Sequence, residues 1–404
     1  MNNLQAINST PNVPQLRFPE FDDFWTSTNL RNVSTRIGDG IHTTPSYSSN
    51  GEYYFINGNN LIDGKIIISN STKKTNKEEY SVHKRNLGDM TILVSLNGTV
   101  GNVSIYQGEK VLLGKSVCYI NLNENINKQL VYYLLQTSNV QKYYASEVTG
   151  STIKNLSLNS VSKTLVNIPA ISEQQKIAEF LATVDDWIVN LRKQKKELEK
   201  YKKGMMQNIF SHEIRFKDEN GKKFPEWQET KLGEISQVMM GQSPDSKSYN
   251  TVNVGLPLIQ GNADIKNRKT IIRNWTSQIT KVCDFGDIIM TVRAPVGYIS
   301  KSMFKACLGR GVCAIKNTRI SDTEFLYQYL LHIEKKWSKF EQGSTFTAVN
   351  TQDIKKYKLL CPSLPEQQNI ADFLTSLDNA IESKQKQIEL VEGWKKGLLQ
   401  MMFV

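Results

Sequence analysis

The sequence has few of the residues from which metal sites and disulfide frameworks are built, with five cysteines and four histidines among 404 residues. The cysteines form no Cys-x-x-Cys pair, and their number is odd: Cys118, Cys283, Cys307, Cys313 and Cys361. They predict buried thiols in a reducing cytoplasm. The histidines lie far apart, with no cysteine or carboxylate at ligand spacing, so the sequence predicts no metal site.

Long apolar runs are also missing. No stretch approaches the roughly 20 apolar residues that a membrane span needs, and residues 1–15 lack the basic start and apolar run of a signal peptide. We therefore expect a cytoplasmic protein without a membrane partner. A hydrophobic content of 39% is still enough to form packed cores, and 404 residues suggest two or three domains.

Motifs for catalysis are incomplete wherever they begin. Gly114-Lys-Ser116 resembles the end of a phosphate loop, but Glu109 stands where that loop requires glycine. Glu229-Thr-Lys231 has the form of a nuclease motif, but the Pro-Asp pair of the chain, Pro244-Asp245, follows it instead of preceding it. No Asn-Pro-Pro-aromatic tetrad for methylating an exocyclic amine is present. We predict no catalytic residue and no cofactor bound by this chain, as expected for a recognition component.

The charge of the chain favours a polyanionic partner. Fifty basic and 39 acidic residues give a net charge of +11, and nucleic acid is the commonest partner of such a protein. Residues 1–171 carry 15 basic and 12 acidic groups, and residues 212–364 carry 23 and 15. Residues 172–211 carry 8 and 6, and residues 365–404 carry 4 and 6. We therefore expect salt-dependent binding to come chiefly from residues 212–364.

An internal repeat organises the whole chain. Residues 168–211 match residues 361–404 without a gap at an offset of 193, with 18 identities in 44 positions. Weaker echoes precede them: Arg17–Phe21 resembles Lys223–Trp227, and Ile56-Asn-Gly-Asn59 resembles Ile259-Gln-Gly-Asn262. A period near 200 residues is too long for a solenoid. The chain is therefore two copies of one unit.

Each copy predicts a β-rich globular part with a few helices, followed by one long helix. Short β-branched runs alternate with glycine and asparagine turns in the first part. Ser172 with Gln175 has the pattern of a capping box at the start of the long helix, and Pro365 occupies the same place in the second copy. The predicted fold class is α+β.

Apolar residues at steps of three and four follow both long helices, as in the seam of a coiled coil. The predicted seam residues are Ile177, Leu181, Val184, Ile188, Leu191 and Leu198 in the first helix and Ile370, Leu374, Leu377, Ile381, Ile388, Val391 and Leu398 in the second. The alternative is a helix packed in a bundle. Two near-copies of one helix most simply pair with each other through a pseudo-twofold axis.

Basic residues that alternate with Asn, Ser, Thr and Tyr are the candidates for DNA contact, because Lys and Arg neutralise phosphates and Arg also reads base edges. The candidates in the first copy are Lys73, Lys74, Lys77, Lys84, Arg85, Ser151 and Thr152. Those in the second copy are Lys247, Tyr249, Lys266, Arg268, Lys269, Arg273, Arg293, Arg310, Ser344 and Thr345. Each cluster has the alternative of a solvated loop. The repeated Gly-Ser-Thr segments at 150–152 and 343–345 have the alternative of a tight structural turn.

The pattern Pro-x-x-x-Glu-Gln-x-x-Ile-Ala-x-x-Leu occurs at Pro169–Leu181 and again at Pro362–Leu374. Repeated in this way after two variable parts, it resembles the specificity subunit of type I restriction–modification enzymes, and the resemblance covers essentially the whole chain. It implies two target recognition domains that each read one half of a bipartite double-stranded DNA sequence. The two helices are then an antiparallel coiled coil that sets the spacer.

The resemblance also implies boundaries and partners. The expected segments are 1–16 (N-terminal), 17–171 (first recognition domain), 172–211 (central helix), 212–222 (linker), 223–364 (second recognition domain) and 365–404 (C-terminal helix). The expected partners are two adenine methylation subunits, which use S-adenosylmethionine, and motor-nuclease restriction subunits, which use ATP and Mg²⁺. Two rivals remain: a stand-alone DNA-binding or scaffold protein, and the specificity portion of a combined methyltransferase–nuclease, which the missing methylation tetrad disfavours.

Overall fold

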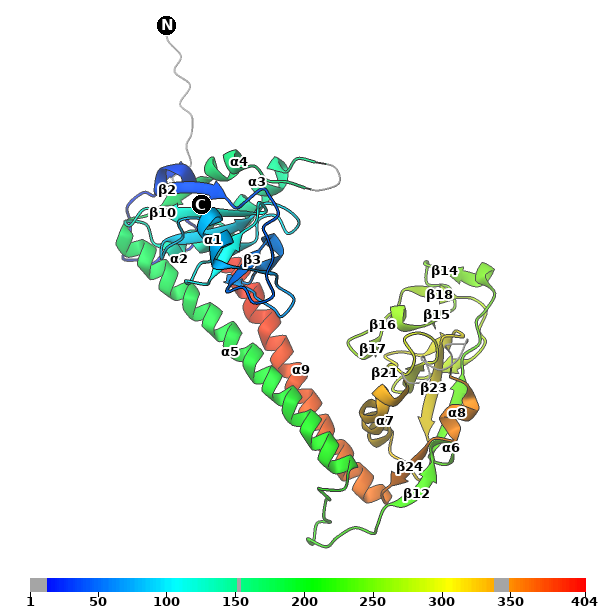
Figure 1. Ribbon diagram of the computed structural model, residues 1–404. Helices are drawn as coiled ribbons and strands as arrows, with labels where there is room; N and C mark the ends of the chain where they lie inside the picture. Colours follow the sequence, from blue (N-terminus) through cyan, green and yellow to red (C-terminus); the bar gives the residue numbers. More distant parts are fainter. Residues whose placement is uncertain (1–12, 151–153, 338–348) are drawn as a thin grey trace. The chain divides into compact units, whose positions relative to one another are not determined.

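The computed structural model describes three stretches of the chain: residues 13–150, 154–337 and 349–404. The chain divides into two compact units (Figure 1). Unit 1 consists of residues 1–192 and 386–404, and unit 2 consists of residues 193–385. Each unit therefore contains one globular part together with half of each of two long helices.

The two long helices are α5 (Ile171–Phe210) and α9 (Leu364–Met401). They pair in antiparallel fashion: the first half of α5 packs with the last half of α9 in unit 1, and the second half of α5 contacts the first half of α9 in unit 2. The predicted α+β fold with two long antiparallel helices is confirmed. Both helices begin one residue earlier than expected, so Ser172 is the second residue of α5 and not its N-cap.

The predicted seam is mostly buried. Ten of its thirteen residues are buried: Ile177, Leu181, Val184, Ile188, Leu191, Ile370, Leu374, Ile388, Val391 and Leu398. Three are half-buried and lie in unit 2: Leu198, Leu377 and Ile381. The buried residues of the first half of α5 share one core cluster with the globular part of unit 1 and with the end of α9. One apolar stripe therefore packs against both the partner helix and the sheet.

The globular part of unit 1 is built on a four-stranded antiparallel sheet in the order β2-β10-β7-β8. Its strands are β2 (Ser34–Asp39), β7 (Thr91–Ser95), β8 (Val103–Ile105) and β10 (Val117–Leu122). Strand β7 is buried along its whole length. Because side chains alternate along a strand, Ile92 packs in the cluster that contains α5, whereas Leu93 packs in a second cluster on the other face.

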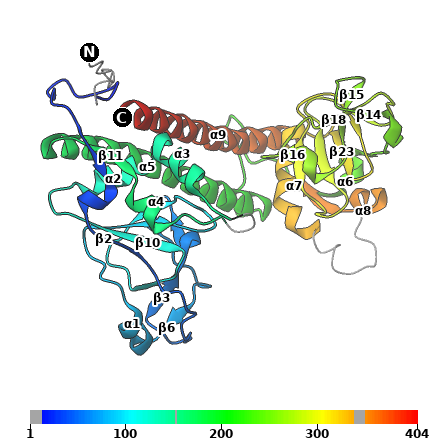
Figure 2. The same ribbon diagram turned by 90° about the horizontal axis from the view of Figure 1, so that it is seen from above.

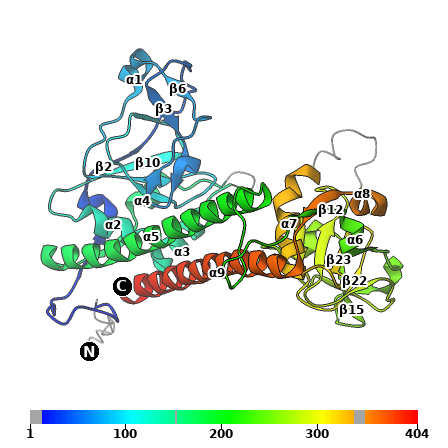
Figure 3. The same cartoon turned by 90° about the horizontal axis from the view of Figure 1, so that it is seen from below.

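That second cluster belongs to a three-stranded sheet in the order β6-β3-β9. Its strands are β3 (Tyr53–Ile56), β6 (Lys74–Thr75) and β9 (Val111–Leu113), and β3 runs parallel to β9. Figures 2 and 3 show the four-stranded sheet lying between α5 and this layer. The helices of this part are α1 (Lys77–His83), α2 (Lys128–Leu134), α3 (Ser138–Glu147) and α4 (Leu158–Ser162). The pair β1 (Thr26–Asn29) and β11 (Leu165–Ile168) and the pair β4 (Leu61–Ile62) and β5 (Lys65–Ile66) complete it.

Unit 2 repeats this plan with additions. A sheet in the order β13-β23-β20-β21-β17-β16 contains β13 (Ser236–Met240), β16 (Ile265–Lys266), β17 (Lys269–Thr270), β20 (Ile288–Thr291), β21 (Ile299–Lys301) and β23 (Val312–Asn317). A sheet in the order β14-β18-β15-β22-β19 contains β14 (Tyr249–Asn250), β15 (Leu256–Ile259), β18 (Asn274–Thr276), β19 (Val282–Cys283) and β22 (Ala306–Leu308). The other strands are the pair β12 (Gln228–Lys231) and β24 (Lys358–Cys361), and the short α-helices are α6 (Leu232–Ile235), α7 (Thr323–Trp337) and α8 (Thr351–Lys355). Figure 1 shows β12 and β24 beside the start of α9, with β14, β15 and β18 at the opposite end of unit 2.

The strand pairings confirm the internal repeat. The parallel pair β3–β9 corresponds to the parallel pair β15–β22, and Ile56 faces Leu113 just as Ile259 faces Leu308. The antiparallel order β2-β10-β7-β8 corresponds to β13-β23-β20-β21. Among the described residues, no helix is long and apolar enough to span a membrane.

Candidate nucleic-acid interface

The glutamate of the repeated motif fixes the globular part of unit 1 to the start of α5. Glu173 is 1% exposed and accepts two hydrogen bonds of 2.7 Å from the guanidinium of Arg17. The indole N–H of Trp25 donates a third bond to Glu173 at 3.3 Å. The hydrogen bond to Glu173 raises the pKa of Arg17. A buried carboxylate is stable only when it is paired in this way.

Unit 2 contains the same arrangement at the start of α9. Glu366 is fully buried and accepts hydrogen bonds from Arg215 at 2.8 and 3.0 Å and from the indole of Trp227 at 3.0 Å. Arg215 is therefore the counterpart of Arg17. The sequence match that aligned Arg17 with Lys223 is wrong at this position, because the chain between Arg215 and Trp227 is longer than the corresponding segment in unit 1.

The glutamine of the motif makes a second contact between the long helix and the globular part of each unit. In unit 1 the side-chain oxygen of Gln174 accepts a hydrogen bond of 2.8 Å from the N–H of Asn127, the N-cap residue of α2. In unit 2 Gln367 accepts one of 2.8 Å from the N–H of Asp322, which precedes α7. Both amides also donate to the carbonyl of the proline in their own motif at 2.9 Å. The Glu-Gln signature thus forms a joint between the long helix and the globular part in each unit.

Away from this joint, four loops meet where the two sheets of each unit converge, and the same backbone hydrogen bonds join them. The bonds in unit 1 are Gly40 N–H to Val117 O (3.2 Å), Gly114 N–H to Ile56 O (2.9 Å) and Leu96 N–H to Ser116 O (2.8 Å). The bonds in unit 2 are Gly241 N–H to Val312 O (3.0 Å), Gly309 N–H to Ile259 O (2.7 Å) and Val292 N–H to Gly311 O (2.9 Å). We call these loops the loop frame: 40–41, 57–60, 96–101 and 114–116 in unit 1, and 241–243, 260–264, 292–298 and 309–311 in unit 2.

The loop frame of unit 2 surrounds a polar pocket of about 320 Å³. Its lining residues are Ser243, Gln260, Gly261, Asn262, Arg293, Ala294, Arg310 and Gly311. Arg310 is exposed, and its backbone N–H and its Nε both point to the Oγ of Ser243, at 3.1 and 3.3 Å. Arg293 is exposed and makes no ion pair or hydrogen bond with its side chain in the stretches that the structure describes. Two arginines therefore line one pocket, and each has N–H donors that no described protein group accepts.

The pocket in unit 2 has a fixed floor of backbone. The buried carboxylate of Asp264 accepts hydrogen bonds from the N–H groups of Gln260 at 2.7 Å and Gly261 at 3.2 Å, which fixes the 260–264 loop. A Cβ atom at Gly311 would lie 2.1 Å from the carbonyl oxygen of Gln260, and one at Gly241 would lie 2.1 Å from that of Gly309. Only glycine fits these positions, so the 309–311 loop packs directly against the backbone of the 260–264 and 241–243 loops.

The loop frame of unit 1 carries different side chains. The hydrogen-bond pattern places Lys115 where unit 2 has Arg310, and Ser116 where it has Gly311. The Oγ of Ser116 donates to Asn57 at 3.0 Å and accepts from the N–H of Gly58 at 2.9 Å. This side chain has no counterpart at Gly311 in unit 2. Lys115 is exposed. The two units therefore combine one backbone frame with two side-chain sets.

The candidates proposed for DNA contact in unit 1 have different environments. Lys73 lies 4.3 Å from the ring centre of Tyr47, and Lys74 lies 5.2 Å from that of Tyr54, so each of these lysines covers an aromatic ring. Lys77 and Lys84 are exposed at the two ends of α1. Arg85 instead donates to the carbonyls of Asp39 at 2.8 Å and Gly40 at 3.1 Å, which holds the backbone next to the loop frame.

In unit 2 the basic candidates divide into paired and unpaired groups. Three of them already have carboxylate partners. Arg268 donates a hydrogen bond of 2.5 Å to Glu334, and Lys269 donates one of 3.1 Å to Glu382 on α9. Arg273 lies 3.7 Å from Asp264. Lys247 and Lys266 are exposed and unpaired within the described stretches.

Tyr249, another candidate, supports the pocket from behind. Its hydroxyl donates to the carbonyl of Pro244 at 3.2 Å and accepts a hydrogen bond from the side-chain amide of Gln260 at 3.1 Å. Tyr249 therefore orients a lining residue of the pocket. Four further candidates lie outside the described residues: Ser151, Thr152, Ser344 and Thr345.

Sequence reasoning missed several side chains of the loop frame, namely Asn57, Asn97, Lys115, Ser243, Gln260 and Asn262. One signal was available, because the echo of Ile56-Asn-Gly-Asn59 in Ile259-Gln-Gly-Asn262 marks one of the loops. Gly114-Lys-Ser116 was interpreted only as a failed phosphate loop. In the structure it is the counterpart of Gly309-Arg-Gly311.

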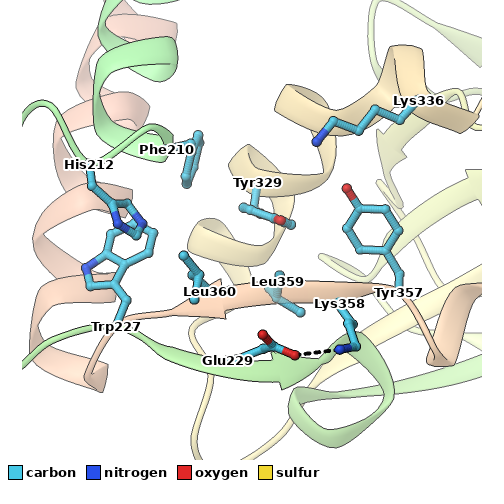
Figure 4. A pocket seen from close by; sticks show the side chains of 10 residues that line it. All are labelled: Phe210, His212, Trp227, Glu229, Tyr329, Lys336, Tyr357, Lys358, Leu359 and Leu360. Atoms are coloured by element: carbon cyan, nitrogen blue, oxygen red, sulfur yellow. Dashed lines mark hydrogen bonds and ion pairs between the residues drawn. The ribbon is translucent and has the colours of Figure 1, made fainter.

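A second pocket, of about 340 Å³, lies where α5 ends beside β12 and β24 (Figure 4). Its lining residues are Phe210, His212, Trp227, Glu229, Tyr329, Lys336, Tyr357, Lys358, Leu359 and Leu360. Figure 4 shows the ion pair of Lys358 with Glu229, at 2.7 Å, at its edge. Phe210 packs edge-on against Tyr329 with 5.3 Å between ring centres. This pocket therefore belongs to the packing of α5 on unit 2.

Metal-binding and redox groups do not gather in the described part of the chain. No cluster of three or more His, Cys, Asp or Glu residues is placed to hold a metal ion there. All five cysteines are free thiols, four of them buried. Burial raises the pKa of Cys361 to about 11 and that of Cys313 to about 12, so both are protonated at neutral pH.

Comparison with known families gives one match that covers most of the chain. The family described as the type I restriction modification DNA specificity domain matches twice, over residues 25–200 and 225–392. The two matched segments correspond to the two copies of the internal repeat.

Two curated relatives come from Methanocaldococcus jannaschii. The putative type I restriction enzyme MjaX specificity subunit is 35% identical over 293 residues, which is 69% of this chain and 68% of the relative. The type I restriction enzyme MjaIX specificity subunit is 30% identical over 212 residues, 48% of each chain.

Two solved structures share the fold. A chain from a study of complex assembly and conformational transition in a type I restriction–modification system is 23% identical, with a TM-score of 0.61 over 94% of this chain and 97% of that one. The S subunit of a type I restriction–modification system from M. genitalium is 18% identical, with a TM-score of 0.60 over 97% of this chain and 99% of that one.

Proposed function

The chain belongs to the family of type I restriction–modification DNA specificity proteins, and from this premise we propose that it is the subunit that chooses the DNA target of such a complex. The globular part of each unit reads one half of a bipartite double-stranded sequence. Helices α5 and α9 set the unspecified spacer between the two halves. In this proposal residues 17–171 and 223–364 are the recognition domains.

The observation that carries this proposal is the doubled loop frame with unlike side chains. A protein that reads one symmetric sequence needs two identical reading surfaces, whereas here the same hydrogen-bonded backbone presents Lys115 in one unit and Arg310 in the other. Two different readers on one chain match a target with two different halves. Each half contributes modest discrimination, and because both readers are on one chain, their contributions to specificity multiply.

We further propose that catalysis resides on partner subunits. Two adenine methylation subunits that use S-adenosylmethionine dock on this chain, and motor-nuclease subunits that use ATP and Mg²⁺ join them in the cytoplasm. The family match and the relatives, all named as specificity subunits, support a recognition role for this chain. A stand-alone DNA-binding protein is the alternative, and it would bind a target without directing methylation.

The test is to express the chain with a methylation subunit from the same host and to map methylated adenines across the host genome. We expect one bipartite motif with a fixed spacer. The purified chain alone, given labelled methyl donor and DNA, should transfer no label. Methylation that does not depend on this chain, or transfer by the chain alone, would contradict the proposal.

Exchange of residues 17–171 for the corresponding part of a relative tests the modular reading. Because the loop frame of unit 1 lies within residues 40–116, this exchange should alter one half of the motif and leave the spacer and the other half unchanged. A change in both halves would show that the two units do not read independently.

A further inference from the structure

We infer that Arg310, oriented by Ser243, reads a guanine in the half-site bound by unit 2, and that Arg293 and Gln260 complete the same base-reading pocket. This inference rests on the proposed function and makes it more specific. It assigns a base preference to one unit and predicts that the other unit lacks this preference at the equivalent position.

The geometry of Arg310 leaves its outer donors available. Its Nε is engaged with the Oγ of Ser243 at 3.3 Å, and the same oxygen takes its backbone N–H at 3.1 Å. The two terminal amino groups have no protein partner in the described stretches. A guanidinium held from behind in this way presents two parallel N–H donors, which match the O6 and N7 acceptors of guanine in the major groove.

The surroundings of Arg310 favour a base over a phosphate. The pocket is concave, and Gly261 in its lining has open space where a side chain would stand, so the flat edge of a base can come close to the backbone there. The amide side chains of Gln260 and Asn262 line the same space, and amides are suited to reading base edges. The amide of Gln260 is itself fixed by the hydroxyl of Tyr249 at 3.1 Å.

Rigidity provides a further argument. Asp264 holds the backbone of Gln260 and Gly261, and the N–H of Gly309 is bonded to the carbonyl of Ile259 at 2.7 Å. The donors around the pocket are therefore positioned before DNA binds, which lowers the entropy lost on binding. A cation that only neutralises phosphate needs no such support.

Unit 1 provides an internal comparison. Lys115 occupies the position of Arg310 on the same frame, and Ser116, whose side chain bonds Asn57, stands at the position of Gly311. A lysine is a point donor and does not make the two parallel bonds of a guanidinium. We therefore expect the unit 1 half-site to lack the guanine requirement that unit 2 imposes at the equivalent position.

The experiment uses the complete methylation complex with the variants Arg310→Lys and Arg310→Gln, and it measures methylation of a library randomised in both half-sites. The wild-type complex should require a G·C pair in the half-site that unit 2 reads. That half-site is identified as the one that stays the same when residues 17–171 are exchanged. Both variants should lower the preference for that pair about 10- to 100-fold, because a bidentate arginine–guanine contact provides discrimination of that order. Ser243→Ala should lower it less, because the arginine remains but is no longer oriented.

Lys115→Gln is the matched control. It removes a cation from the same position in unit 1 and should leave the unit 2 half-site unaltered. Unchanged thermal midpoints would show that the variants are folded. For a variant that unfolds, the wild-type library result still tests the inference, because a unit 2 half-site without a G·C pair overturns it.

A phosphate contact would give a different result. Arg310→Gln would then weaken binding to all sequences equally and reduce the salt slope by about one, and this outcome would overturn the inference while leaving the proposed function intact. If the wild-type complex methylates no bipartite motif, the proposed function itself fails. The two failures are therefore distinguishable.

Discussion

The ammonium nitrogen of Lys202 on α5 lies 2.7 Å from both carboxylate oxygens of Asp378 on α9. The same ion pair occurs once more, because Lys395 on α9 lies 2.6 Å from Asp185 on α5. Each residue of one pair lies 193 positions from its equivalent in the other, which is the offset of the sequence repeat. The antiparallel register of the two helices is thus fixed by one ion pair in unit 2 and an equivalent one in unit 1.

Both aspartates also bind the globular part of their own unit. The hydroxyl of Tyr133 on α2 donates to Asp185 at 2.9 Å, and the amide of Gln328 on α7 donates to Asp378 at 2.7 Å. Burial, followed by the charge of Asp185, raises the pKa of Tyr133, so its hydroxyl stays protonated and donates. Each aspartate therefore connects three helices.

Asp378→Asn should destabilise unit 2 by about 2 kcal/mol, because it leaves the buried ammonium of Lys202 without a counter-charge. The measurement is the urea midpoint together with hydrogen exchange along α5 and α9. Asp372→Asn is the control, since Asp372 is an exposed carboxylate on the same helix. Equal losses for the two variants would show that the ion pair does not hold the helices.

Glu366→Gln should release the globular part of unit 2 from the start of α9. The change leaves Arg215 without the charge of its fully buried carboxylate partner. We expect the free energy of unfolding to fall by about 3 kcal/mol. Limited proteolysis should then cleave faster between residues 211 and 227. Glu226→Gln alters the other carboxylate that Arg215 contacts, which is 87% exposed, and should have little effect. Comparable cleavage in both variants would contradict this assignment.

A matched insertion tests whether the helices set the spacer. Four residues inserted in α5 between Lys195 and Lys196, without a matching insertion in α9, shift the two helices out of register. Lys202 then no longer faces Asp378. A second insertion of four residues in α9, between Lys384 and Gln385, restores the pairing, because these residues lie opposite Lys195 and Lys196 in the register of the two ion pairs. The double insertion should lengthen the spacer by at most about two base pairs, since four helical residues add about 6 Å and each base pair about 3.4 Å. Methylome sequencing with an unaltered spacer would show that the helices are not the ruler.

The sequence was sufficient to predict the paired helices and the doubled architecture. The stretch that contains Glu173 and Glu366 repeats without gaps, and each glutamate accepts hydrogen bonds from an arginine and a tryptophan. The arginine partners could not be matched in the same way. The segment after Arg215 is longer than the one after Arg17, and a contact that spans more than 150 positions is fixed only by the fold.

The reading surface was only partly predictable for a related reason. Arg310 was identified among the basic candidates, but the sequence does not show that Ser243 orients it or that Lys115 is its counterpart. Nor does it show that Arg268 and Lys269 are engaged with carboxylates. Loops tolerate insertions, so their offset drifts, and hydrogen bonds to neighbouring strands alone reveal which positions correspond.

The pairing of cations also refines the expected salt dependence of DNA binding. Residues 212–364 have the larger basic surplus, 23 against 15, but a cation that already faces a carboxylate releases few counterions when DNA binds. Lys266 is exposed and unpaired within the described stretches, whereas Lys269 bonds Glu382 at 3.1 Å. Lys266→Gln should therefore reduce the slope of log affinity against log salt by about 0.9, and Lys269→Gln should leave it nearly unchanged. Equal slopes for the two variants would mean that the ion pair opens on DNA or that neither lysine meets a phosphate.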